Sequence, residues 1–225
     1  MALVTAEVAA DRLGISVRQV QRLARAGELK AVGPNRFEWD SVIRRQGVRQ
    51  SHHRRAWTDA TAWAAVAILG KGDIKADWLG QAQRSRLKSR LREVTSRDLI
   101  ARARNRATVH RLTGHRSVAA RVAAEVVVSG SSRSIGELMA ASVDRVDGYV
   151  DHAGYAALVS RFTLSAAEAG TGNVILRATG FSLDVVEALA DQSDVLGGLD
   201  LAESLDAREQ SAGLAVLDEA LGRLH

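Results

Sequence analysis

The first forty residues constrain the fold most, because helix caps and turn residues alternate there at short intervals. Thr5 is expected to cap a short helix that ends near Leu13, and Gly14 permits a tight turn after it. Ser16 is expected to cap a second helix, which Gly27 stops. Two short helices joined through a glycine turn predict a helix-turn-helix arrangement.

The second predicted helix has two different faces. Its apolar side chains share one face, and its cations lie on the opposite face at helical spacing: Arg18, Arg22 and Arg25. The pattern that follows predicts two brief strands, 29–32 and 36–39, joined by a turn tripeptide at 33–35. Such a hairpin would form a wing beside the helix and would present Arg36 close to its tip.

The succession of a short helix, the letters LGIS, a basic helix, the letters AGEL and a strand pair resembles the excisionase or MerR-like winged helix-turn-helix family. A closing helix over residues 41–46, capped by Asp40, would complete that pattern. In the family, the second helix enters the major groove of DNA and the wing touches the flanking backbone. The resemblance therefore implies a set of DNA-binding residues on this helix and wing: Ser16, Arg18, Gln19, Arg22 and Arg36. Arg25, on the same cationic face of the helix, is a further candidate for DNA binding.

The chemistry of these side chains agrees with the resemblance. Arginine offers two donors to guanine, glutamine can pair with adenine, and cations bind phosphates of any sequence. Residues 44–57 form a basic connector that either lies near phosphates or is a solvated tether. The alternative for the whole region is a solvated basic face on an ordinary helical hairpin.

Composition limits the remaining choices. With 225 residues, of which 46% are hydrophobic, the chain is long enough for one large or two small domains. No stretch approaches the roughly 20 apolar residues that span a bilayer, and no signal-peptide pattern is present. We therefore expect a soluble cytoplasmic protein that does not bind membranes. The chain has no cysteine, and its six histidines form no recognisable ligand set, so we expect neither a metal nor a cofactor.

Charge is divided unevenly along the chain. Residues 1–136 contain 26 Lys or Arg against 11 Asp or Glu, whereas residues 137–225 contain 5 against 15. A basic front portion is typical of a nucleic-acid-binding protein, and an acidic rear portion would be a poor surface for DNA. We therefore expect the rear portion to meet something other than DNA.

Helix and strand signals predict an α+β fold with three domains. Residues 1–50 would form the winged helix-turn-helix, residues 51–130 a basic and mainly helical middle domain, and residues 131–225 an acidic, small α+β domain. The middle domain could be a second winged helix, or a helical linker domain whose arginines are solvated or face the acidic rear. For the first alternative, the candidate DNA contacts lie on a basic helix: Arg84, Lys88 and Arg92.

The last third of the chain alternates strand and helix signals. Strands are expected at 145–151 and, as a pair, at 162–164 and 173–178, and Asp206 is expected to cap the final helix. This part is similar to the C-terminal region of AbiEi-type antitoxins at scattered positions: Asn173, Leu176, Arg177, Asp200, Ala202, Asp206, Arg208 and Gly213.

That family joins a winged DNA-binding domain, used in autoregulation, to a domain that counteracts a nucleotidyltransferase toxin. The resemblance implies an antitoxin and autorepressor that binds its own promoter and has a cognate toxin as a partner. The resemblance of the N-terminal domain to MerR-like proteins, which usually dimerise, implies a homodimer on DNA. One alternative is a ligand-responsive or dimeric transcription regulator without a toxin, and another is a recombination directionality factor. We expect no enzyme, because Asp144 and Asp147 are spaced i, i+3 rather than as a metal-binding pair, and no catalytic motif is present.

Overall fold

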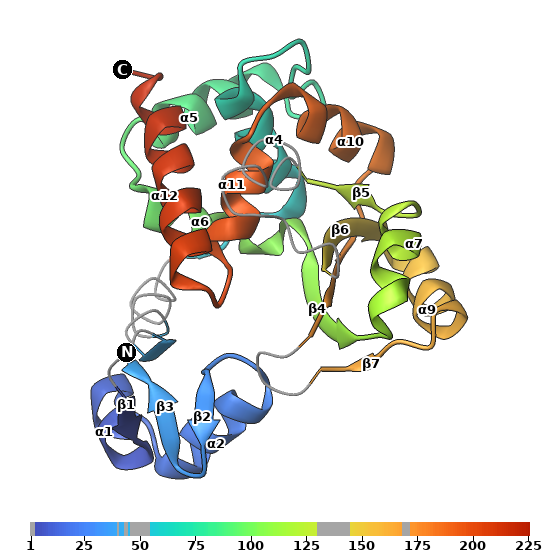
Figure 1. The fold of residues 1–225 in the computed structure, drawn as a ribbon. Coiled ribbons are helices and arrows are strands. Elements are labelled where there is room, and N and C mark those ends of the chain that lie inside the picture. Colours follow the sequence, from blue (N-terminus) through green and yellow to red (C-terminus); the bar gives the residue numbers. More distant parts are fainter. Residues whose placement is uncertain (1–2, 40, 43–44, 46–54, 130–144, 168–171) are drawn as a thin grey trace.

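The computed structural model describes residues 3–39, 41, 42, 45, 55–129, 145–167 and 172–225. It combines an N-terminal unit with a larger body of helices around a sheet (Figure 1). The N-terminal unit contains these elements: β1 (Leu3–Thr5), α1 (Ala6–Leu13), α2 (Val17–Arg25), β2 (Ala31–Gly33) and β3 (Arg36–Glu38). Its strands form an antiparallel sheet in the order β1-β3-β2.

Both predicted caps of the N-terminal helices are confirmed. The Val8 amide donates to Thr5 Oγ1 at 3.4 Å, and the Gln19 amide donates to Ser16 Oγ at 3.3 Å. Gly14 ends α1 with a φ of 61°, a left-handed conformation that glycine adopts at little cost. The two helices and the turn between them therefore form the predicted helix-turn-helix.

The predicted wing is present as the β2–β3 hairpin. Its turn contains Asn35, whose φ of 58° lies in the left-handed region that asparagine tolerates better than most residues. Strand β1 was not expected from the sequence, and it pairs with β3 so that Leu3 lies opposite Glu38 and Thr5 opposite Arg36. A strand of three residues is too short to show the alternation by which strands are recognised.

Apolar side chains from the helices and strands meet inside the N-terminal unit. The buried members of this core are Ala6, Ala9, Ala10, Leu13, Val20, Leu23, Ala24, Leu29, Phe37 and Val42. Of the closing helix predicted over 41–46, residues 41, 42 and 45 are helical, whereas Asp40, its expected cap, lies outside the described residues. The core includes Val42, so the segment after β3 packs against the helix-turn-helix.

The body begins with three helices and continues with alternating strands and helices. Its elements are α4 (Asp59–Gly70), α5 (Gln81–Leu91), α6 (Ser96–Ala103), the 3-10 turn η1 (Arg104–Arg106), β4 (Thr108–Thr113), η2 (Arg116–Val118), α7 (Ala119–Ala123), β5 (Val127–Val128), β6 (Val146–Asp151), α9 (His152–Arg161), β7 (Ser165–Ala166), β8 (Val174–Thr179), α10 (Leu183–Gln192), α11 (Val195–Ala202) and α12 (Ala207–Gly222). Asp206 caps α12 as predicted, because its Oδ1 accepts from the Arg208 amide at 2.8 Å.

The five body strands form one sheet in the order β5-β6-β8-β4-β7. β6 and β8 run parallel, and the other pairs are antiparallel. Helices α7 and α9 lie against one side of the sheet, and the other helices of the body gather on the opposite side (Figure 1). Strand alternation gives each side its own side chains: on β8, Val174 and Leu176 join the core beneath α7 and α9, whereas Arg177 points to the opposite side.

The expected strand pair between 162–164 and 173–178 is wrong. Residues 162–164 form the turn that ends α9, in which the Leu164 amide donates to the Val159 carbonyl at 2.9 Å and Thr163 has a φ of 51°. β8 pairs instead with β4 and β6. The apolar residues at 162 and 164 suggested a strand, but the structure uses them as buried side chains at a helix terminus.

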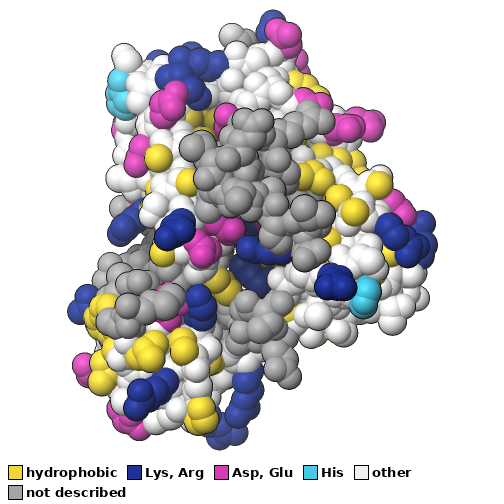
Figure 2. All heavy atoms as spheres, in the orientation of Figure 1, with side chains coloured by type: hydrophobic (Ala, Val, Ile, Leu, Met, Phe, Trp, Pro, Cys, Tyr) yellow, Lys and Arg dark blue, Asp and Glu magenta, His cyan; other side chains and the backbone are white. Residues whose placement is uncertain are grey.

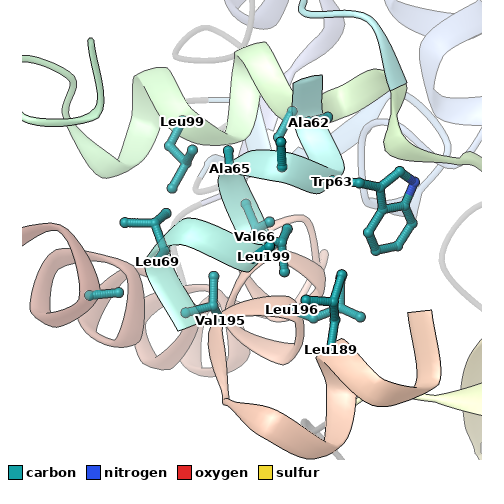
Figure 3. Close-up of a cluster of buried hydrophobic side chains, with 14 of the residues drawn as sticks. Ala62, Trp63, Ala65, Val66, Leu69, Leu99, Leu189, Val195, Leu196 and Leu199 are labelled. Atoms are coloured by element: carbon teal, nitrogen blue, oxygen red, sulfur yellow. The ribbon is translucent and has the colours of Figure 1, made fainter. Parts of the chain in front are cut away.

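Both sides of the domain boundary expected near residue 130 contribute to one sheet and one core. β4 lies between β7 and β8 in the sheet, and α4 packs against α10, α11 and α12. Side chains of α4, such as Trp63 and Leu69, meet Leu196 and Leu199 of α11 (Figure 3). The reason is visible in α4 itself, which buries residues around its whole circumference and therefore needs neighbours on every side.

Candidate DNA interface

Helix α2 has a buried face and a cationic face, as the sequence predicts. Val20, Leu23 and Ala24 are buried in the core of the N-terminal unit. The cations on the opposite face, Arg18, Arg22 and Arg25, are exposed, and so are Ser16 and Gln19 at the start of the helix. In Figure 2 several Lys and Arg side chains project from this unit, at the lower left of the molecule.

The cations of α2 are not used for internal ion pairs within the part of the chain that the structure describes. Ion pairs of the N-terminal unit involve other side chains: Arg45 with Glu28 at 2.6 Å, and Lys30 with Glu38 at 3.2 Å. A guanidinium without a carboxylate partner keeps its donors available for phosphates or base edges. The face of α2 is therefore chemically suited to bind DNA.

The wing holds its cation near the helix-turn-helix. Arg36 is exposed directly after the turn residue Asn35. Hydrogen bonds from the side chains of Thr5 and Asn35 and from the Glu7 backbone amide lower the pKa of the Glu7 carboxyl, and the Thr5 bond contributes most. In the β1–β3 ladder Arg36 lies opposite Thr5, the N-cap of α1, so the strand pairing places Arg36 beside the helix-turn-helix.

The second predicted set of DNA contacts lies on α5 and directly after it: Arg84, Lys88 and Arg92. Arg84 forms an ion pair with Asp77, and Arg92 Nε donates to the Leu224 carbonyl at 3.1 Å. Lys88 is exposed. The cations of α5 at 84 and 92 thus also serve to attach this helix to its surroundings, a role that their spacing in the sequence did not reveal.

The structure brings together a buried ionic cluster that the sequence analysis missed. It consists of side chains from the sheet, from η1 and from the end of α11: Arg106, Asp147, Tyr149, Arg177, Asp200 and Glu203. Arg106 holds Glu203 with two hydrogen bonds of 2.7 and 2.8 Å, and Arg177 holds Asp147 with two of 2.7 and 2.9 Å. Alternating polar residues on β6 were the signal that could have indicated it.

The opposite charges of the cluster shift the pKa values of its members. Burial opposes ionisation of Glu203, but the positive charges of Arg106 and Arg177 outweigh it and lower the pKa of Glu203 to about 2. Burial raises the pKa of the Tyr149 hydroxyl well above its usual value. Burial also raises the pKa of Asp147 despite the attraction of Arg177.

The hydrogen bonds of the cluster also involve Asp147, which was considered from the sequence, together with Asp144, as a metal-binding pair. Asp147 has both oxygens bound by Arg177, and Asp144 lies outside the described residues. Among the described residues, no group of three His, Asp or Glu side chains is placed to hold a metal ion.

In the part of the chain that the structure describes, no helix is long and apolar enough to cross a membrane.

The N-terminal unit is also recognisable by comparison with known proteins. A family model described as a helix-turn-helix domain matches residues 3–45, which are 43 of the 225 residues. Comparisons with curated proteins and with solved structures gave no match. The match covers β1 to the helix after β3, and it supports DNA binding by this domain. It does not extend to the MerR-like subtype or to the AbiEi-type antitoxins.

Proposed function

We propose that the protein is a transcription regulator that binds operator DNA by placing α2 in the major groove. The observation that carries the proposal is the exposed row of Arg18, Arg22 and Arg25 opposite the buried face of a correctly capped α2. A major groove roughly 12 Å wide admits one α-helix. Because the α2 core residues fix the helix, this row is held in one orientation toward the groove.

Individual side chains then have different tasks. Ser16, Arg18, Gln19 and Arg22 lie along the first two turns of α2, where the second helix of such a domain meets base edges. Arg25, near the end of the helix, and Arg36, on the wing, would bind phosphates. A single helix reads a short site, so we expect two copies to bind two half-sites on one side of the duplex.

The finer role that we propose is autorepression combined with antitoxin activity. The rear portion has 15 acidic residues against 5 cations, and exposed members such as Asp184, Glu187 and Asp218 lie on α10 and α12. An acidic surface favours a basic partner, and a nucleotidyltransferase toxin needs a basic groove for its substrates. The alternative is a regulator without a toxin, whose rear portion dimerises or binds a ligand. We do not propose a recombination directionality factor, because such proteins are much shorter than this chain.

Two experiments test these functions separately. Selection of binding sites from random duplexes with the full chain, followed by shift assays, measures DNA binding. Arg18→Ala and Arg22→Ala should each weaken specific binding by about 1–3 kcal/mol, whereas Lys75→Ala, an exposed cation of the body, should not. Unchanged affinity in both α2 variants would contradict the proposal. Co-expression with the product of the neighbouring gene tests the antitoxin role. The absence of a complex would contradict the antitoxin role and would leave the proposal of DNA binding unchanged.

A further inference from the structure

Helix α5 is attached to the body by a narrow stripe. Leu87 and Leu91 are its buried side chains, with exposed fractions of 3% and 0%. The other side chains of α5 are exposed, apart from the half-buried Arg84. A helix advances by about 100° per residue, so the face opposite these two leucines is directed away from the body.

Cations flank this outward face on both sides. Helical geometry places Lys88 and Arg92 beside one edge of the leucine stripe and Arg86 and Arg90 beside the other. The side chains along the outward line between the two cationic rows are small: Ala82, Ser85 and Ser89. The exposed surface of α5 is therefore a low ridge with positive charge on each flank.

Part of this charge is uncompensated. Arg84 pairs with Asp77 and Arg92 donates to a carbonyl, but within the described residues no carboxylate forms an ion pair with Arg86, Lys88 or Arg90. Figure 2 shows Lys and Arg side chains at the upper left, where Figure 1 places α5 and the C-terminal end of α12. Three unpaired cations on little more than one helical turn attract polyanions.

We propose that the outward face of α5 binds the backbone of duplex DNA, with Lys88 on one side of a groove and Arg86 and Arg90 on the other. An α-helix about 10–12 Å in diameter fits between the two backbones of a major groove roughly 12 Å wide. Small residues on the ridge allow close approach, and the two cationic rows face the two phosphate strands. A flat acidic protein surface would meet only one of these rows.

The inference rests on the proposed function, because it adds a second contact to a regulator that already binds DNA through α2. It differs from the set expected from the sequence, since Arg86 and Arg90 replace Arg84 and Arg92. The added contact is to the backbone, so it should increase affinity for all sequences alike. Sequence discrimination would remain with α2.

The test compares two triple variants of the full chain that carry the same change in net charge. One is Arg86→Gln, Lys88→Gln and Arg90→Gln; the control is Lys75→Gln, Arg116→Gln and Arg208→Gln, three exposed cations elsewhere on the body. Glutamine preserves helix propensity, and thermal unfolding verifies that both variants fold. The measurement is the affinity for a mixed-sequence duplex as a function of salt concentration.

The α5 variant should lower the slope of log K against log salt by about 2–3, because each lost phosphate contact removes about 0.9. The control should change the slope by less than about 0.5, since its cations lie away from the DNA. Equal slopes for the two variants would overturn the inference. An α5 variant with an unchanged slope that no longer self-associates in sedimentation would also overturn it, because the outward face of α5 would then bind a second copy of the chain. Failure of the proposed function has another signature, because Arg22→Ala would then leave discrimination between sequences unchanged.

Discussion

Arg106 and Asp200 form an ion pair inside the body, with 2.8 Å between Nη2 and Oδ1 and exposed fractions of 2% and 1%. The pair connects the turn before β4 to helix α11, which are far apart in the sequence. Tyr149 on β6 joins it, since its hydroxyl donates to the same Asp200 oxygen at 2.7 Å and accepts from Arg106 Nε at 3.1 Å. A side chain from the sheet and one from the turn before β4 thus share a single carboxylate of α11.

Removing one partner of this pair should destabilise the fold strongly. Arg106→Met leaves Asp200 and Glu203 with fewer donors in a buried site, and the expected loss in the free energy of unfolding is about 3–5 kcal/mol. Arg223→Met is the matched control, because its ion pair with Glu219 lies at the surface and should contribute no more than about 1 kcal/mol. Urea unfolding measures both, and a similar small loss in the two variants would contradict a stabilising role of the cluster.

The low pKa of Glu203 predicts how the free energy of unfolding depends on pH. Its folded pKa of about 2 lies below the ordinary value of 4.5, so its contribution is complete above pH 5 and is lost as the pH falls toward 2. The side chain is 18% exposed, which limits the contribution to no more than about 3 kcal/mol. The difference in unfolding free energy between the native chain and Glu203→Gln should therefore shrink between pH 5 and pH 2. A difference that is constant over this range would be evidence against the depressed pKa.

Gly213 should tolerate no side chain, because it lies where α12 crosses α11. A Cβ at this position would come to 2.5 Å from the Gly198 carbonyl oxygen and closer still to the Ala202 amide nitrogen. Gly213→Ala should destabilise the protein by about 1–3 kcal/mol, although alanine is the better helix former. Gly222→Ala in the same helix has no atom within 4 Å of the new Cβ and should be neutral or slightly stabilising. Thermal unfolding of the two variants gives the comparison, and equal shifts would exclude a close helix crossing.

Arg36 on the wing should contribute affinity without discrimination. Arg36→Ala removes one exposed cation after the turn at Asn35, so binding should weaken by a similar factor for all duplexes, and the salt slope should fall by about 1. Shift assays on a selected site and on base-substituted versions of it measure the effect. A loss confined to one base position would instead assign Arg36 to base recognition.

The helix-turn-helix could be predicted because its signals are local. Caps at Thr5 and Ser16 and the turn at Gly14 depend on neighbouring residues, and the structure confirms each of them. The buried cluster could not be predicted in this way, since Arg106 and Glu203 meet only after the sheet and α11 are assembled. The contact of Arg92 could not be predicted for the same reason, because its partner, the Leu224 carbonyl, lies far away in the sequence.

Pairing of strands was the least predictable part of the fold. The sequence predicts strands at 145–151 and 173–178, but nothing local indicates that β6 pairs with β8 in parallel or that β4 lies on the other side of β8. Residues 162 and 164 were misassigned because a short apolar run is compatible with a strand and with a helix terminus alike. Long-range packing decided between the two.

Whether the first turns of α2 read base sequence is measured by the ratio of affinities for a selected site and for the same site with one base pair changed. For the native chain each critical change should reduce affinity by about 1–3 kcal/mol. In Arg22→Ala at least one of these positions should lose its effect while the others keep theirs. If Arg22→Ala and Arg18→Ala both retained every base preference of the native chain, α2 would not be the recognition helix.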